Sequence, residues 1–245
     1  MSESLPPEIS SESENPSEIQ SILSILMWLF FLYLPSVMLS IIFVIYGSNS
    51  AGVVDVEHWL KDGDVNAVFS ICMALITLPV LKIALEDDNI KNKRAYLGLA
   101  NKFSFEHFRP WLALTFVYIS FGTSMYWLLD MPMSAWMVSL ASTTDNLVLS
   151  IIALVIVAPI FEELIFRGYI FSKLQATKLG NYGAVIITAV VFTAIHNHYQ
   201  IFELLDIFVL AILLSFVRLK ANNLYYCIII HMVNNLVAFI VLNLN

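Results

Sequence analysis

The chain has 245 residues, of which 59% are hydrophobic and only 13% charged, with a mean hydropathy of +0.81 and a formal net charge of −7. A soluble protein with so few charged residues could not cover its own surface, whereas a chain surrounded by lipid needs no such covering. The composition excludes a soluble globular protein and predicts an all-α polytopic membrane helix bundle.

The first twenty residues differ in kind from the rest. They contain five glutamates, three prolines and no lysine or arginine. This composition predicts a disordered acidic tail over residues 1–20. A cleavable signal would need a basic start and a short apolar stretch, so we expect none here.

The predicted membrane spans follow from apolar runs of about 20 residues, the length that crosses a bilayer. Seven segments qualify, although polar groups interrupt the fourth, fifth and sixth of them. The segments are 22–46, 65–85, 111–129, 147–166, 183–198, 203–217 and 224–244. We therefore expect about seven transmembrane helices.

The basic residues predict the orientation, because lysine and arginine accumulate on the cytoplasmic side of membrane proteins. With a cytoplasmic N-terminus, eleven of the twelve basic residues fall on the cytoplasmic side and Lys61 alone falls outside. We therefore expect a multi-pass protein of the cell membrane, a bacterial inner membrane, with an external C-terminus. The loop 86–110 mixes charged and aromatic residues, and either an amphipathic surface helix or a solvated loop fits it.

Deep inside the predicted spans we single out six ionisable and amide side chains, all in the last hundred residues. They are Glu162, Glu163, His196, His231, Asn234 and Asn235. A single histidine or asparagine in a span often serves only in packing between helices. Several such groups on three helices are costly to bury together in lipid, so they predict a shared functional site.

The sequence predicts different roles for the two adjacent glutamates. Glu163 and Arg167 are four residues apart, which is the favoured order for an ion pair on one helix face. Glu162 points about 100° away from that face and is not matched by the arginine. A carboxylate left unpaired in a low-dielectric medium holds a proton readily and suits general acid–base catalysis.

Three chemistries could use this set. Glutamate with two histidines resembles a zinc ligand set, but the sequence has no HExxH helix. Acyl transfer would need a nucleophile, and no serine stands out near His196 or His231. The third is water activated by Glu162 and His196, with His231 and Asn235, one helical turn apart, as donors to the oxyanion.

Three motifs stand in the order that the CAAX-protease and bacteriocin-processing family (CPBP, or Abi) shows on its helical core. They are Glu162-Glu163-x-x-x-Arg167, Phe192-x-x-x-His196 and His231-x-x-x-Asn235. With the "FRG" at 166–168, the sequence resembles this family of intramembrane proteases over about residues 145–245. The resemblance implies a catalytic core at 145–245, preceded by a three-helix membrane region at 21–144.

The resemblance also implies an endopeptidase that cuts a peptide bond in or beside the membrane. In the family, the first glutamate and the FxxxH histidine are taken to activate water, and the second histidine and the asparagine to form the oxyanion hole. These roles fall on Glu162, His196, His231 and Asn235, while Glu163 and Arg167 would support the site.

The expected partners are membrane lipid and a membrane-anchored, prenylated or precursor peptide, with no nucleic acid. We favour no cofactor. The alternative is zinc or another divalent metal held by Glu162, His196 and His231. A different reading of the whole chain is a non-catalytic membrane scaffold or bacteriocin-immunity protein.

Depth in the membrane constrains this arrangement. A helix that starts at Tyr182 would carry His196 about 21 Å from the cytoplasmic surface, whereas Glu162, five residues from Arg167, would lie only about 7 Å from it. The two can meet only if residues 176–186 lie outside the core or the helix is steeply tilted. The glycines of "KLGNYGAV" could supply a break.

Overall fold

The computed structural model describes residues 18–50, 52–131 and 133–244. In order, the elements are α1 (Glu18–Asn49), α2 (Val56–Leu60), α3 (Gly63–Asp87), α4 (Lys93–Tyr96), α5 (Phe105–Leu128), α6 (Ala135–Ser142), α7 (Leu147–Ser150), the π-helix η1 (Ile151–Val157), α8 (Ala158–Glu163), the π-helix η2 (Leu164–Ile170), α9 (Phe171–Gln175), α10 (Gly180–Ala194), α11 (Ile201–Ala221) and α12 (Leu224–Leu244). These residues contain no strand, and the chain is an all-α polytopic membrane bundle.

Each of the seven predicted spans corresponds to a helical segment. Five segments are long and apolar enough to cross a membrane: Glu18–Asn49, Gly63–Asp87, Phe105–Leu128, Leu147–Gln175 and Leu224–Asn243. The other two segments, α10 and α11, are weaker candidates for membrane spans because of their length or their charge. α10 has only 15 residues, and α11, with 21, includes Glu203, Asp206, Arg218 and Lys220. Seven crossings therefore stay a prediction, while five are supported by length and composition.

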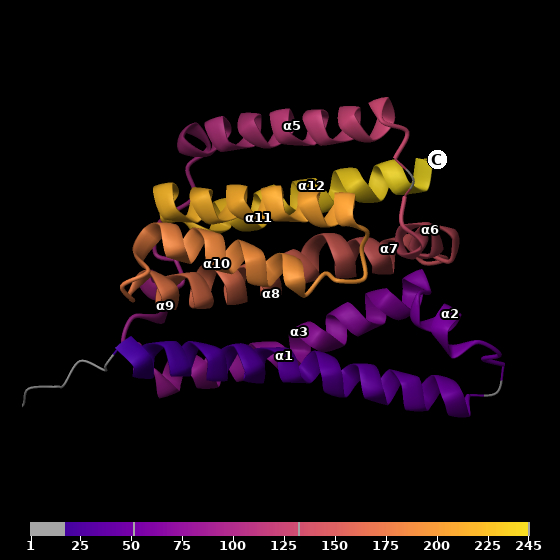
Figure 1. The fold of residues 1–245 in the computed structure, drawn as a ribbon, viewed down its shortest axis with the longest axis horizontal. Coiled ribbons are helices and arrows are strands. Elements are labelled where there is room, and N and C mark those ends of the chain that lie inside the picture. Colours follow the sequence, from indigo (N-terminus) through magenta and orange to yellow (C-terminus); the bar gives the residue numbers. More distant parts are fainter. Residues whose placement is uncertain (1–17, 51, 132, 245) are drawn as a thin grey trace, which may run out of the picture.

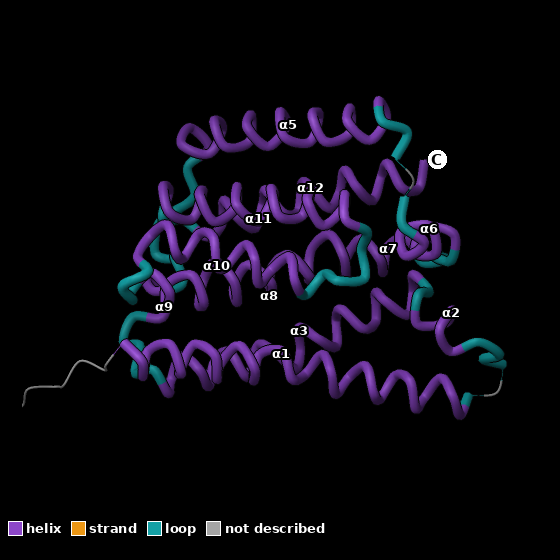
Figure 2. Tube along the Cα trace, in the orientation of Figure 1, coloured by secondary structure: helices purple, strands orange, loops and turns teal. Residues whose placement is uncertain are grey.

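The long segments reverse direction from one to the next (Figure 1). The start of α1 therefore shares one end of the bundle with the connections 88–104, 176–179 and 222–223, and the connections 52–62, 133–146 and 195–200 lie toward the other. In Figure 2 the loops of these connections are teal, while the short helices α2 and α6 within them are purple. Ten of the eleven basic residues predicted to be cytoplasmic belong to the first end, and Lys61 belongs to the second.

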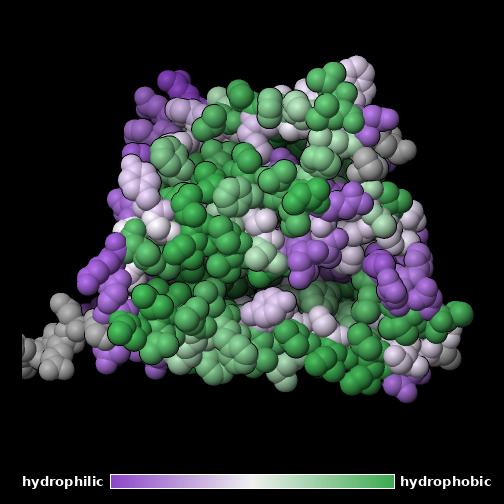
Figure 3. Space-filling model, in the orientation of Figure 1, coloured by the Kyte–Doolittle hydropathy of each residue, from purple (hydrophilic) through white to green (hydrophobic). Residues whose placement is uncertain are grey.

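Surface hydropathy follows the same division. In Figure 3, hydrophobic residues cover the middle of the visible face and hydrophilic residues gather toward its two ends. An apolar band between polar ends is the surface that a bilayer requires.

The fourth span departs most from the prediction. It ends at Gln175 and not at 166, because α7, η1, α8, η2 and α9 follow one another without a break. Arg167 is consequently fully buried inside this composite helix and not at its cytoplasmic end. Pro159 lies at the start of α8 without ending the composite helix, since the Ala158 N–H bonds back to the Ala153 carbonyl, five residues earlier.

This continuation removes the predicted mismatch in depth. Glu162 is 13 residues before Gln175, or about 20 Å along the helix, and His196 is 16 residues after Gly180, or about 24 Å. The connection is the short turn 176–179, with Gly180 in the left-handed region at φ 58°. Neither steep tilt nor an excluded segment 176–186 is required, and that part of the expectation was wrong.

Two other expectations change at the ends of the chain and in the loop. Residues 18–20, assigned to the tail, are helical, while the rest of the predicted tail lies outside the described residues. Loop 86–110 is neither a long surface helix nor a free loop. It contains the four-residue α4 and docks on the α11–α12 turn, where the Leu224 N–H donates to the Gly98 carbonyl at 2.9 Å.

Candidate active site

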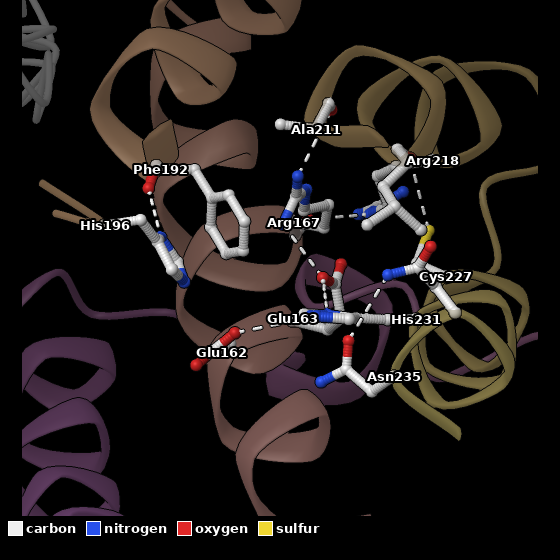
Figure 4. Close-up of polar contacts among 12 residues, drawn as sticks. Glu162, Glu163, Arg167, Phe192, His196, Ala211, Arg218, Cys227, His231 and Asn235 are labelled. Atoms are coloured by element: carbon white, nitrogen blue, oxygen red, sulfur yellow. Dashed lines mark hydrogen bonds and ion pairs between the residues drawn. The ribbon is translucent and has the colours of Figure 1, made fainter. Parts of the chain in front are cut away.

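The structure brings the polar residues of the second half together from α8, η2, the end of α10 and α12 (Figure 4). The positions follow from helix periodicity. Glu163 and Arg167 share one face, as do His231 and Asn235 on α12. The π-helices on both sides of α8 change the register of the chain around the glutamates, as such segments often do beside functional sites.

Glu163 is the centre of a buried ionic network. Its Oε1 accepts from Arg167 Nη1 at 2.8 Å and from His231 Nδ1 at 2.9 Å, and the Glu163 side chain is fully buried. Arg167 also donates to the Ala211 carbonyl at 3.2 Å, and its guanidinium lies 4.5 Å from the centre of the Phe192 ring. The predicted ion pair between Glu163 and Arg167 is present, and it extends to a third helix.

Glu162 has different surroundings. Its side chain is 17% exposed, and its one ion-pair contact within the described ranges is His231 Nε2, at 3.8 Å from Oε2. That separation is too long for a hydrogen bond. Glu162 therefore keeps a carboxylate with free acceptor positions, as the sequence predicts for the unpaired member of the pair.

His196 lies one residue beyond the C-cap of α10 and is partly buried. Its Nδ1 is 2.7 Å from the Phe192 carbonyl oxygen. A carbonyl only accepts, so Nδ1 carries the proton and Nε2 of the neutral ring carries a lone pair. The FxxxH spacing thus places one helical turn between the histidine and the carbonyl that sets its tautomer, and that lone pair can accept a proton from water.

His231 and Asn235 each have one side already occupied. His231 Nδ1 donates a hydrogen bond to Glu163, and the other ring nitrogen, Nε2, is directed toward Glu162. Asn235 Nδ2 donates to the Leu154 carbonyl of η1 at 3.0 Å. An amide nitrogen has two protons, so the second remains for another acceptor.

A cavity of about 1460 Å³ adjoins these groups, and Glu162, His196, His231 and Asn235 all line it. The opposite wall comes from the first half of the chain, with Tyr33 on α1, Met73 on α3 and Tyr118 on α5 among its residues. The face drawn in Figure 3 is hollowed between α1 and α10. An extended peptide with an apolar group could reach Glu162 and His196 through such a space.

One buried carboxylate, that of Glu203, was not identified from the sequence. Glu203, at the start of α11, accepts from the Ser134 N–H at 2.9 Å and the Gln200 N–H at 2.8 Å. It therefore caps α11, which follows the turn carrying His196, and fixes the segment before α6. The capping spacing from Gln200 to Glu203 was visible in the sequence, but the contact with Ser134 depends on the fold.

A metal site was the alternative use of Glu162, His196 and His231. The Nε2 atoms of both histidines and the Glu162 carboxylate have suitable donor chemistry. However, across residues 18–50, 52–131 and 133–244 no group of three or more His, Cys, Asp or Glu side chains is arranged to hold a metal ion. The mechanism below uses the chain's own groups, and a metal held by Glu162, His196 and His231 stays the alternative to be tested.

Comparison with known proteins matches residues 144–237 to the family described as "Type II CAAX prenyl endopeptidase Rce1-like". Residues 144–237, which we call the Rce1-like domain after this match, include all three motifs, from Glu162 to Asn235. The match confirms the predicted resemblance to CAAX-type intramembrane proteases.

Two curated bacterial proteins share part of the chain. The "Uncharacterized 24.3 kDa protein" of Escherichia coli is 26% identical over 132 residues, which is 50% of this chain and 59% of that protein. The "UPF0177 protein YxdF" of Lactococcus lactis subsp. lactis is 34% identical over 81 residues, which is 33% of this chain and 43% of that protein. The chain thus spans about half the length of these relatives, and no solved structure matches it significantly.

Proposed function

We propose that this protein is an intramembrane endopeptidase that hydrolyses a peptide bond of a membrane-associated protein or peptide. The observation that carries the proposal is the contrast between two adjacent carboxylates. Glu163 is fully buried and bonded to Arg167 and His231, whereas Glu162 faces a large cavity that it shares with His196.

Water activation is assigned to Glu162 and His196. A water molecule between them would find acceptors in the Glu162 carboxylate and in His196 Nε2, the ring nitrogen that the Phe192 bond leaves unprotonated. Removal of one proton makes the water a nucleophile toward the peptide carbonyl. The protonated Glu162 can then deliver a proton to the departing amine.

Stabilisation of the oxyanion is assigned to His231 and Asn235. Asn235 has a second amide proton, besides the one it donates to Leu154, to offer. His231 can donate from Nε2 only when its ring carries both protons, since Nδ1 already donates to Glu163. The carboxylates of Glu163 and Glu162 lie on its two sides, 2.9 Å from Nδ1 and 3.8 Å from Nε2.

The proposed substrates are membrane-anchored, prenylated or precursor peptides. Support comes from the cavity, which combines aromatic and methionine side chains from α1, α3 and α5 with the polar site, and from the CAAX prenyl endopeptidase description of the Rce1-like domain. A peptide attached to a lipid-soluble group can enter such a cavity from the membrane, where both partners are already concentrated.

Reconstitution in liposomes tests the reaction. Purified protein is given fluorogenic peptides that carry a CAAX sequence, each with or without a farnesyl group, and product is identified by mass spectrometry. Cleavage by the natural chain and none by Glu162→Gln supports the proposal. If a biological effect of the protein survives Glu162→Gln, the chain acts as a scaffold or immunity protein.

The same preparation tests the metal alternative. We expect less than one bound zinc, or other divalent metal, per active chain, and unchanged turnover after chelation. Stoichiometric metal, with activity lost on chelation and restored by metal, would overturn the proposed mechanism.

We also propose a cell-membrane location, in a bacterial inner membrane, with the N-terminus cytoplasmic. The ten basic residues at one end of the bundle and the single lysine at the other support this orientation. Membrane-impermeant thiol reagents applied to intact cells should label Asp62→Cys but not Asn92→Cys. Labelling of Asn92→Cys from outside would reverse the topology.

A further inference from the structure

A second buried arginine takes no part in the proposed reaction. Arg218, in the last turn of α11, is 4% exposed and forms no ion pair with a carboxylate in the described part of the chain. Burying an unpaired charge is costly unless its hydrogen-bonding capacity is met. The contacts of Arg218 therefore show what its burial achieves.

All the acceptors around Arg218 are neutral, and they come from three different parts of the fold. Nε donates to the Arg167 carbonyl at 2.9 Å, and Nη2 donates to Ser172 Oγ at 3.2 Å, so both bonds reach the composite helix. Nη2 also donates to the Tyr96 carbonyl of α4 at 3.1 Å, and Nη1 donates to Asn222 Oδ1. A planar fork of five N–H donors can satisfy such a set, whereas a single ammonium group cannot.

The surroundings leave the guanidinium little freedom. Gly98 packs directly against it, since a Cβ at this position would lie 2.8 Å from Arg218 Cζ. Gly98 has φ 76°, a conformation that favours glycine, and its carbonyl accepts from the Leu224 N–H at the start of α12. Arg218 therefore lies where η2, α4, α11 and the start of α12 meet.

Arg167 links this junction to the candidate active site. Its backbone carbonyl accepts from Arg218, while its side chain is bonded to Glu163, and Glu163 in turn is bonded to His231. Figure 4 shows Arg218 beside Arg167, on the far side from Glu162. A shift of η2 would move Arg167 and Glu163 together and change the direction of His231 Nε2.

We propose that Arg218 is a positioning residue of the active site, which fixes η2 against α4 and α11 and thereby sets the Arg167–Glu163–His231 network. This inference rests on the proposed peptidase function. It predicts an effect on turnover beyond any effect on stability, because displacement of catalytic groups by about 1 Å can cost about 10²-fold in rate.

The test compares Arg218→Lys and Arg218→Met with Arg109→Met, an exposed arginine at the same end of the bundle. For folded protein in liposomes, we expect kcat to fall about 10-fold in Arg218→Lys and about 100-fold in Arg218→Met, with KM within about twofold of the natural value. The control should keep its kcat. If Arg218→Lys keeps the natural kcat and shows only a lower unfolding temperature, Arg218 is merely structural and the inference is wrong.

A second readout needs no peptidase activity. Diethyl pyrocarbonate modifies histidine rings, and mass spectrometry resolves the rate at each site. In Arg218→Met we expect the rate at buried His231 to rise several-fold, while exposed His58 and His107 stay constant. An unchanged rate at His231 contradicts the positioning role. If the rate at His231 changes but the natural chain cleaves no peptide, the positioning role of Arg218 is supported and the proposed peptidase function is wrong.

Discussion

The two halves of the molecule handle burial in opposite ways. In α1, α3 and α5 the described residues bury apolar side chains with a few hydroxyl groups such as Thr77 and Thr115. From residue 147 onward, the buried residues include Glu163, Arg167 and Arg218. Each of these charged side chains is hydrogen-bonded to a residue of another element. Loss of the partner of a buried ion destabilises a fold by about 3–5 kcal/mol, so such bonds are needed wherever a charge is buried.

Helix geometry differs in the same way. α1 and α3 remain uninterrupted α-helices although each contains a proline. The composite helix of the Rce1-like domain instead contains two π-helical segments, one on each side of the glutamate pair. The difference teaches that the first half can serve as a wall of the cavity with ordinary helices, whereas the second half distorts its helix where the polar network forms.

The largest expected effect is loss of turnover in Glu162→Gln and in His196→Ala. Both groups would act on the same water, so either change should lower kcat by at least about 10³-fold, within the range for general acid–base catalysis. Cleavage of a membrane-anchored peptide in liposomes measures the effect, and size-exclusion chromatography checks folding. Active Glu162→Gln protein alongside inactive Glu163→Gln protein would reverse the roles of the two carboxylates.

Glu163→Gln should instead act on stability. It leaves Arg167 buried without its counter-ion, so the free energy of unfolding should fall by about 3–5 kcal/mol. Denaturant titration in detergent micelles measures the change. Glu57→Gln is the matched control, because it removes the exposed ion pair with Lys61 and should change stability little. An equal fall in the free energy of unfolding in both variants would contradict the prediction that the buried ion pair contributes more to stability than the exposed one.

Asn235→Ala should lower kcat by about 10²–10³, the usual effect of removing one oxyanion donor. KM should change little, because the donor acts on charge that appears only in the transition state. Steady-state kinetics separates the two constants. A raised KM with unchanged kcat would show that Asn235 contacts the bound substrate and not the oxyanion.

The smallest expected effect lies in the first half. Met73 on α3 lines the cavity from the first half of the chain. Met73→Ala removes apolar contact with the substrate, so KM should rise about fivefold, as expected for the loss of a few methylene contacts, with kcat within about twofold. Lys82→Ala, on the exposed side of the same helix, is the control. A fall in kcat comparable to that of Asn235→Ala would mean that the first half does more than bind substrate.

Much of this architecture could be predicted from local sequence. Apolar runs marked the long helices to within a few residues, except for the start of the third span, where α5 begins at Phe105, and the end of the fourth. The i, i+4 spacings identified the Glu163–Arg167 pair and the shared face of His231 and Asn235. The fourth span was cut short because Arg167 was read as a surface residue, although its charge is neutralised by Glu163 and its guanidinium also contacts Ala211 and Phe192.

By itself the sequence determined the membrane character, the helical periodicities and the identity of the polar groups, because these depend on composition and on neighbours within two helical turns. Only the tertiary structure decided which partner each polar group receives. Glu163 joins His231, 68 residues away, and Arg218 joins the Arg167 carbonyl, 51 residues away. In a low-dielectric interior those long-range contacts decide whether a charge is tolerated, and no local pattern specifies them.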